Sequence, residues 1–262
     1  MPLTLKNFYR SPQELCFTAN TAGSTIKLNK IWSPLTISLE TSIDANNWTV
    51  YTIWSTITLS NVWDKIYMRN TSETPVDWGG NGSYYYQFVI SWSVAASWDI
   101  NYLLCKNSTN TTIAYCYINL FNWCTGLTSA PKLPATEAKE GCYRSMFFWC
   151  TGLTEAPELP FTSVERICCY DMFNWCTNLT SIPLLKPTSF VFQCCRNMFS
   201  WCSKIKLSTT QTWEYQTEYR IPTTWTWSMS GDALYNMFGS TWWTFTWTPT
   251  INTTYYTSNT LV

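Results

Sequence analysis

The sequence predicts a mainly β protein with short helical turns, in which a β-sandwich-like N-terminal module precedes a repeat solenoid and a C-terminal cap. Three observations predict this fold class. Apolar and polar residues alternate over residues 12–104, a 26-residue repeat occupies residues 105–207, and residues 208–262 are rich in Thr and aromatic side chains. We therefore divide the chain into three parts at these boundaries.

The N-terminal part has the pattern of half-buried strands. Residues 53–59 and 65–68 alternate apolar with polar side chains, and turn-forming residues recur about every 8 to 12 positions. Such spacing is typical of a small antiparallel sheet or sandwich.

The middle part is a repeat whose period never slips. Three full copies and one truncated copy cover residues 113–207. A unit of this length cannot bury its own core, so the period predicts an array of stacked units. The clearest columns at this period are Phe121, Phe147, Phe173 and Phe199; Trp123, Trp149, Trp175 and Trp201; Cys116, Cys142, Cys168 and Cys194; and Cys124, Cys150, Cys176 and Cys202.

Each unit is expected to contain one short helical and one short extended segment. The segment from the first Cys through Met-Phe is predicted to form a short helix or helical turn, and the Leu-Thr-x-Ala-Pro-x-Leu segment a short strand. The Phe, Leu and Cys columns then form the interior. A further Tyr-Asn-Met-Phe copy at residues 235–238 lies off the period, and we interpret it as part of a cap that covers the open end.

The best copy of the unit resembles a known repeat. Residues 143–147 (YRSMF) and 150–160 (CTGLTEAPELP) are similar to the 26-residue leucine-rich repeat of BspA-like bacterial surface proteins. Residues 15–70 resemble the β-rich module that precedes the repeats of such proteins, residues 85–89 the segment that leads into them, and residues 232–238 and 248–256 their C-terminal end. The resemblance implies a leucine-rich-repeat solenoid and a surface-exposed or phage-borne binding protein without catalytic residues.

The composition argues against several classes of function. The 16 basic and 16 acidic residues cancel, whereas a nucleic-acid-binding protein needs a basic footprint. The chain has no histidine, the commonest general base and metal ligand, so we expect no enzyme, cofactor or metal. No apolar run approaches the roughly 18 residues of a membrane span. Residues 1–10 lack the apolar core of a secretion signal, so either the mature chain is given or the protein reaches the cell surface, the medium or a virion by another route. A plain cytosolic protein fits this start of the chain but fits poorly with the Thr/Ser/Asn-rich remainder.

The 12 cysteines allow three interpretations. Eight of them form two columns that lie eight residues apart within each unit, whereas zinc sites favour Cys pairs about two to four residues apart. We favour packing of small apolar thiols in the core over disulfides, and disulfides over a metal site.

Two other patterns are assigned structural roles. Glu137 with Glu140, and Glu155 with Glu158, lie in variable loops without a partner nucleophile, so they are expected on the solvated surface. Residues 42–48 (SIDANNW) loosely resemble an Asp-box hairpin, which is a structural turn.

The chain contains unusually many tryptophans and unusually few glycines. The chain has 17 Trp and 9 Gly, although Gly makes up about 7% of an ordinary protein, or about 18 residues here. One interpretation is that many of these codons are UGA, which some genetic codes translate as Gly; the other is a lineage that uses tryptophan as an aromatic column. Trp48 matches a Trp of BspA-like proteins, but those proteins mostly have Gly where this chain has the four column residues and Trp32, Trp54, Trp63, Trp92, Trp98, Trp213, Trp225, Trp227, Trp242, Trp243 and Trp247.

The expected function is non-enzymatic surface binding or adhesion. In a repeat array the varying positions form the natural contact face. The expected partner is a host-surface or extracellular-matrix protein or glycan. The alternative is a structural or decoration protein of a virion, in which the repeats only space or stiffen. The predicted contact positions are Asn122, Lys132, Phe148, Glu158, Asn174 and Ser200.

Overall fold

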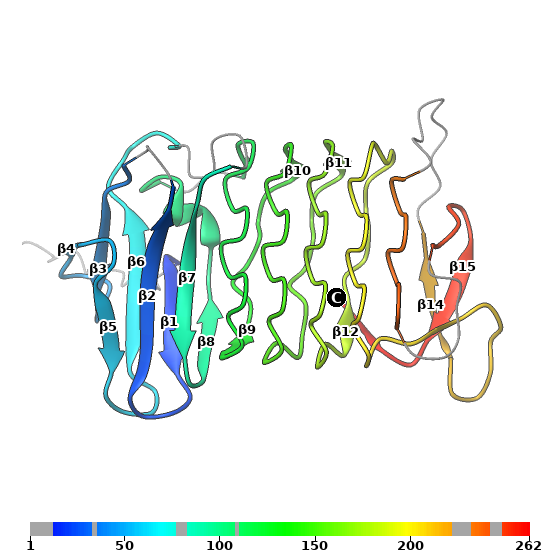
Figure 1. Cartoon of the computed structure of the whole chain (residues 1–262), viewed down its shortest axis with the longest axis horizontal. Coiled ribbons are helices and arrows are strands. Elements are labelled where there is room, and N and C mark those ends of the chain that lie inside the picture. The colour runs from blue at the N-terminus through cyan, green and yellow to red at the C-terminus, as the bar shows by residue number, and fades with distance from the viewer. Residues whose placement is uncertain (1–12, 33–35, 77–82, 108–109, 222–231, 242–247) are drawn as a thin grey trace, which may run out of the picture.

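The chain folds into a mainly β structure with hardly any helix (Figure 1). This computed structural model describes residues 13–32, 36–76, 83–107, 110–221, 232–241 and 248–262. Residues 1–10, considered above as a secretion signal, and Trp225, Trp227, Trp242, Trp243 and Trp247 lie outside the described residues. Within them the helical element is a 3₁₀ helix, η1 (Ile100–Leu103).

A six-stranded sheet forms one layer of the N-terminal part. Its strands pair antiparallel, except that β9 runs parallel to β8. The order across the sheet is β4 (Thr49–Tyr51), β3 (Leu39–Ser42), β6 (Lys65–Asn70), β1 (Leu15–Ala19), β8 (Val94–Ser97) and β9 (Leu127–Ser129).

A three-stranded antiparallel sheet forms the other layer. It consists of β5 (Thr56–Leu59), β2 (Ser24–Ile31) and β7 (Tyr85–Ser91), in that order. The two sheets face each other, and the Phe17 ring on β1 meets the Phe88 ring on β7 with 5.0 Å between centroids. Alternate residues of β2 are buried between the sheets, as expected from the apolar–polar alternation.

The 26-residue units continue both layers. The Phe88 amide of β7 donates to the Leu120 carbonyl at 2.7 Å, so the Cys-to-Trp segment of the first unit follows the three-stranded sheet. Strand β9, from the Leu-Thr segment of the same unit, follows β8 in the other sheet. One apolar core cluster therefore runs from Leu15 to Tyr255, across the boundary predicted at residue 104.

The Cys-to-Trp segments form stacked turns, so the expected helical segment is wrong. Alternate amides bond within the unit and to the next unit. Tyr117 N donates to Cys142 O (3.0 Å) and Phe121 N to Met146 O (2.9 Å), whereas Leu120 N donates back to Tyr117 O (3.2 Å). A helix would use every amide within its own segment. Here half of the amides hold neighbouring units together instead.

A left-handed backbone conformation recurs at every fourth position of these segments. The angle φ is 57° at Tyr115, 55° at Asn119 and 64° at Trp123, and the second unit repeats the pattern at Gly141 (59°) and Trp149 (60°). Glycine adopts this conformation freely, and asparagine tolerates it because its short polar side chain bonds locally. An ordinary side chain costs about 1–2 kcal/mol there. The turn ribbon therefore favours glycine or asparagine at fixed positions, although Tyr115, Ile167 and Gln193 also adopt this conformation there.

Short parallel strands join the units in the second layer. Strand β10 (Glu137–Ala138) pairs with β11 (Ser163–Val164), and β12 (Ser181–Ile182) pairs with β16 (Thr260–Leu261). The predicted Leu-Thr strand is confirmed in the first and third units, as β9 and β12, whereas residues 153–159 of the second unit form no strand. The C-terminal segment thus lies beside β12 of the third unit.

The off-period copy lies against the fourth unit. Phe199 N donates to Met237 O at 2.8 Å, and the rings of Phe199 and Phe238 stack with 5.4 Å between centroids. The Tyr219 ring packs edge-on against Phe238. Tyr219 belongs to an antiparallel sheet of β13 (Leu207–Ser208), β15 (Thr254–Thr257) and β14 (Thr217–Arg220).

One continuous column of phenylalanine rings fills the core between the layers. Each ring is fully or almost fully buried, and successive centroids lie 5.1–5.6 Å apart. Because the column crosses every unit, each ring supports two neighbours. The column consists of Phe88, Phe121, Phe147, Phe173, Phe199 and Phe238.

Phe173→Ala should lower the free energy of unfolding by about 3–5 kcal/mol, because it leaves a cavity between two stacked rings. Urea unfolding monitored by circular dichroism measures the change. Glu155→Ala, at an exposed position of the neighbouring unit, is the control and should stay within about 0.5 kcal/mol. Equal losses in the two variants would contradict the assignment of the Phe column to the core.

Candidate binding surfaces

The structure divides the predicted contact positions between the two layers. Asn122, like the equivalent residues of later units, lies in the layer that follows β7, and its carbonyl accepts from Gln87 Nε2 at 2.7 Å. Lys132 lies in the other layer, where its amide donates to Trp98 O just beyond β8 at 2.7 Å. The phenylalanine column lies between these two layers and so separates Asn122 from Lys132. The six positions therefore do not form one face.

Two of the predicted contact positions are buried, so their outward assignment is wrong. Asn174 donates through Nδ2 to Asp171 Oδ1 at 2.9 Å, and Ser200 donates through Oγ to Gly239 O at 3.1 Å. Both side chains are buried; Asn174 bonds another side chain of its unit, and Ser200 bonds the backbone of the off-period copy. Asn122 and Phe148, at the same position of other units, are half-buried. The varying position before each tryptophan is thus mainly structural.

Lys132 and Glu158 are brought together in one groove of about 320 Å³. They occupy equivalent positions of successive units, and both side chains are exposed. Proline has no amide hydrogen, so the four prolines of this groove donate no ladder bonds and contribute apolar rings, while Lys132 between two of them bonds to Trp98. The groove is lined with Ala130 and Leu133, and with the prolines Pro131, Pro134, Pro157 and Pro160.

The two charges of the groove are not neutralised by each other. Among the described residues, no ion pair joins Lys132 to Glu158, and the Lys132 ammonium instead lies 5.5 Å from the centre of the Trp98 ring. Some other charges of the repeats are paired; for example, Lys139 Nζ lies 2.8 Å from Glu137 and 3.3 Å from Glu165. The groove therefore offers a ligand one cation and one anion beside an apolar floor.

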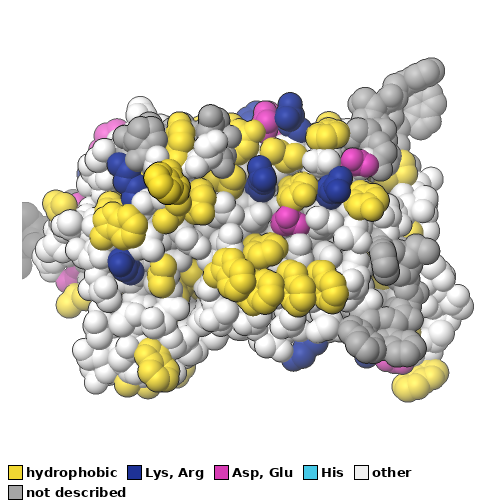
Figure 2. All heavy atoms as spheres, viewed as in Figure 1, with side chains coloured by type: hydrophobic (Ala, Val, Ile, Leu, Met, Phe, Trp, Pro, Cys, Tyr) yellow, Lys and Arg dark blue, Asp and Glu magenta, His cyan; other side chains and the backbone are white. Residues whose placement is uncertain are grey.

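A hydrophobic row crosses the opposite layer (Figure 2). The indole rings of Trp123, Trp149, Trp175 and Trp201 stack with 4.4–4.5 Å between centroids, and Phe148 lies 6.3 Å from Trp123. Contiguous exposed hydrophobic surface commonly marks an interaction site. Each tryptophan of the row also has φ between 60° and 65°, which is unusual for a bulky side chain.

The cysteine columns pack in the core as free thiols. All 12 cysteines are buried and unbridged. In the second column each thiol lies within hydrogen-bond distance of a Phe carbonyl one unit back, for example Cys150 Sγ to Phe121 O and Cys176 Sγ to Phe147 O, both at 3.0 Å. Burial raises the pKa of the Cys176 thiol to about 12, so the reactive thiolate is scarce at neutral pH.

The native protein should therefore react with iodoacetamide far more slowly than the same protein in guanidinium chloride. At pH 8 we expect almost no carboxamidomethylation of Cys150 or Cys176 before unfolding and complete labelling afterwards, with or without reductant. Peptide mass spectrometry after a timed pulse measures this. Labelling in denaturant that requires reductant would show disulfides and contradict the free-thiol assignment.

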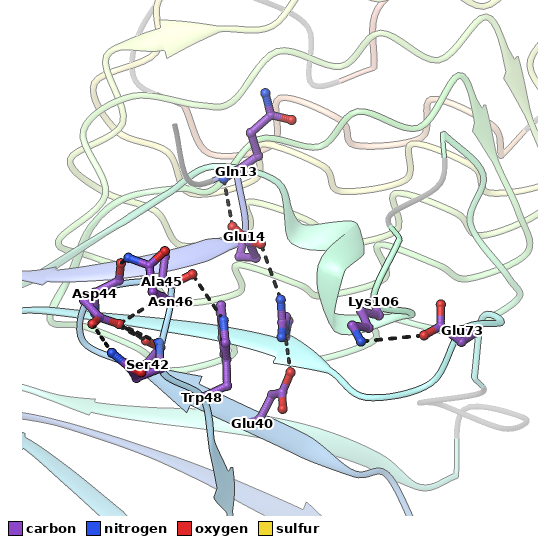
Figure 3. Close-up of polar contacts among 12 residues, drawn as sticks. Gln13, Glu14, Glu40, Ser42, Asp44, Ala45, Asn46, Trp48, Glu73 and Lys106 are labelled. Carbon is purple, nitrogen blue, oxygen red and sulfur yellow. Dashed lines mark hydrogen bonds and ion pairs between the residues drawn. The ribbon is translucent and has the colours of Figure 1, made fainter. Parts of the chain in front are cut away.

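Residues 42–48 form a closed structural turn (Figure 3). The Asp44 carboxylate accepts hydrogen bonds from Ser42 Oγ (2.7 Å) and from the amides of Asn46 (2.9 Å) and Asn47 (2.8 Å). These donors favour the charged form, and the pKa of Asp44 lies well below its ordinary value. The Asp44 carboxylate thus accepts hydrogen bonds from groups of the turn itself, which agrees with the structural role expected from the sequence.

Trp48 closes this turn and anchors it to the sheet. Its indole Nε1 donates to Ala45 O at 3.2 Å, and the Arg69 guanidinium lies 3.8 Å from the centre of its ring. Arg69 is also paired with Glu40 and Glu14. The indole of Trp48 is therefore used both as a hydrogen-bond donor and as the aromatic partner of a cation–π contact.

In an NMR titration the Asp44 carboxyl should titrate well below 3.8, its ordinary value. The folded chain binds this proton less readily than the unfolded chain, so the turn stabilises the fold above about pH 4 and loses this contribution as the pH falls further. Ser42→Ala, which removes one donor, should move the pKa upward. A wild-type carboxyl that titrates at the ordinary value would contradict the hydrogen-bonded turn.

Comparisons of the chain with protein-family models, curated proteins and solved structures find no match. In the described part of the chain no helix has the length and apolar character to cross a membrane. The described residues also hold no group of three or more His, Cys, Asp or Glu side chains arranged to bind a metal ion.

Proposed function

We propose that this chain is a non-enzymatic surface binding or adhesion protein, exposed outside the cell or on a virion. In this proposal the stacked units are a BspA-like leucine-rich-repeat solenoid, preceded by a β-sandwich-like module and closed by a C-terminal cap. The support comes from the backbone bonds between successive units, such as Trp149 N to Asn174 O at 2.9 Å, and from the unbroken phenylalanine column. Both hold the units in a constant relative orientation.

The observation that carries the proposal is the proline-lined groove with Lys132 and Glu158 at its edge. Its volume of about 320 Å³ lies at the lower end of the range for ligand sites. An apolar floor supplies contact area, and two unneutralised charges of opposite sign set the orientation of the ligand. We therefore favour a protein segment of a host surface or extracellular matrix, with one acidic and one basic group, over a neutral glycan.

The rigidity of the stack also suits a binding role. Equivalent residues of successive units lie on backbone segments that are hydrogen-bonded to the units on either side. The protein backbone therefore loses little conformational freedom when a ligand binds. Glycine at position 152 illustrates how closely the units approach, since a Cβ there would come within 2.4 Å of the Thr125 carbonyl oxygen. The groove is thus preformed by contacts that do not involve a ligand.

Exchanging the two groove charges tests the proposal. The double variant Lys132→Glu/Glu158→Lys keeps the net charge but reverses the polarity that a bound segment meets. We expect attachment to matrix-coated plates and cultured cells to fall at least tenfold, with the melting temperature nearly unchanged because both residues are exposed.

The matched control is Lys106→Glu/Glu73→Lys, which reverses an exposed ion pair of 3.7 Å outside the groove lining (Figure 3). It should attach like the wild type. Unchanged attachment of the groove variant would exclude this groove as the contact site. A wild-type protein that attaches to none of these surfaces would count against adhesion and in favour of a spacing or stiffening role in a particle.

A further inference from the structure

We infer that nine tryptophan positions of this sequence carry glycine in the native protein, because their codons are UGA and the source organism reads UGA as glycine. The inference concerns the tryptophans whose backbone lies in the left-handed region. They are Trp32, Trp54, Trp63, Trp92, Trp98, Trp123, Trp149, Trp175 and Trp201.

The backbone angles separate these tryptophans from the others. Eleven tryptophans lie in the described residues, and nine of them have φ between 52° and 75°. Only a few per cent of non-glycine residues adopt such angles, and a bulky side chain there is a genuine outlier. The cause is steric: in this conformation Cβ approaches the following carbonyl oxygen. Tryptophan also lacks the short polar side chain that lets asparagine compensate.

Trp48 shows what a structurally used tryptophan looks like in this chain. Its backbone is not left-handed, its indole donates to Ala45 O, and its ring receives Arg69. By contrast Trp32 has φ 52°, its residue is 90% exposed, and it makes no ring contact with any described residue. This difference between Trp48 and Trp32 is the one expected between a true tryptophan codon and a glycine position. Trp54 and Trp98, with a Lys ammonium 5.3 and 5.5 Å from the ring centre, resemble Trp48 in that contact but share the left-handed backbone of Trp32.

The aromatic-column alternative explains too little. Stacking accounts for Trp123, Trp149, Trp175 and Trp201, whose rings contact one another. The remaining five lie outside the column and share the same backbone conformation. Trp63 and Trp92, for example, are exposed at the ends of strands, in turns where glycine is the usual residue. One cause that covers all nine is preferable to a cause that covers four.

Glycine at these nine positions would give the native protein a different surface. With glycine at these positions the four stacked indoles would be absent from the hydrophobic row of Figure 2, and of the row described above only Phe148 would remain. The proline-lined groove would keep all of its lining residues, because none of them is a tryptophan, although the Lys132 ammonium would lose its contact with the Trp98 ring. The proposed function and this inference can therefore fail separately.

The deciding experiment uses the protein purified from its native source, together with the sequenced gene. We expect UGA at the nine codons, UGG at codon 48, and glycine in the peptides that contain positions 149 and 175. Tandem mass spectrometry reads those positions directly. Tryptophan at 149 and 175, or UGG at the nine codons, would overturn the inference.

A second experiment tests the physical basis on recombinant protein. Trp32→Gly should raise the melting temperature by about 2–4 °C, because the left-handed strain is removed. Trp213→Gly is the matched control: Trp213 is 88% exposed, like Trp32, but is not left-handed. It should not raise the melting temperature, because glycine only adds freedom to the unfolded chain.

Trp32→Ala completes the set, since alanine keeps the Cβ that causes the strain and should not match the gain of glycine. A Trp32→Gly variant that melts no higher than Trp32→Ala, or that loses as much stability as Trp213→Gly, would contradict the strain argument. All three variants change one exposed residue, so failure to fold is not expected to obscure the comparison.

Discussion

The backbone hydrogen bonds between successive units are the constraint on which the rest of the structure depends. Every second amide of a Cys-to-Trp segment donates to the next unit, as Phe121 N does to Met146 O. The same residues of each unit are thereby held in line, and the phenylalanine rings and thiols fall into columns as a consequence. The alternation of bonds is accompanied by a left-handed residue at every fourth position, where glycine and asparagine are the least strained residues.

These constraints decide which positions remain free to serve a function. In the turn ribbon the residue before the tryptophan is buried in the third and fourth units, where Asn174 bonds the Asp171 side chain and Ser200 bonds the backbone, and half-buried in the first two. In the proline-containing layer the chain makes fewer ladder bonds, and side chains such as Lys132 and Glu158 are left exposed. A position that varies between units therefore has a mainly structural role in the turn ribbon, whereas in the proline-containing layer the varying Lys132 and Glu158 meet in one groove.

The columns and the mainly β class were predictable because they depend on the sequence period, whereas two local assignments failed. The expected helical turn was wrong because left-handed residues such as Asn119 interrupt any helix, and side-chain pattern does not reveal φ. The binding face was only partly predictable. Lys132 and Glu158 lie one period apart and meet in one groove, but nothing in the period tells that Phe148 belongs to the opposite layer.

The sequence by itself determined the unit length, the residues that face the core and the scarcity of glycine at turn positions. Each of these can be read from the sequence because the same residue type recurs at a constant spacing. Only the tertiary structure decided how each unit is shared between two layers, where the C-terminal strand β16 pairs, and which tryptophans are strained. The physical reason is that pairing and backbone angle depend on contacts between residues far apart in the chain. Thr260, for instance, lies beside Ser181 although 79 positions separate them.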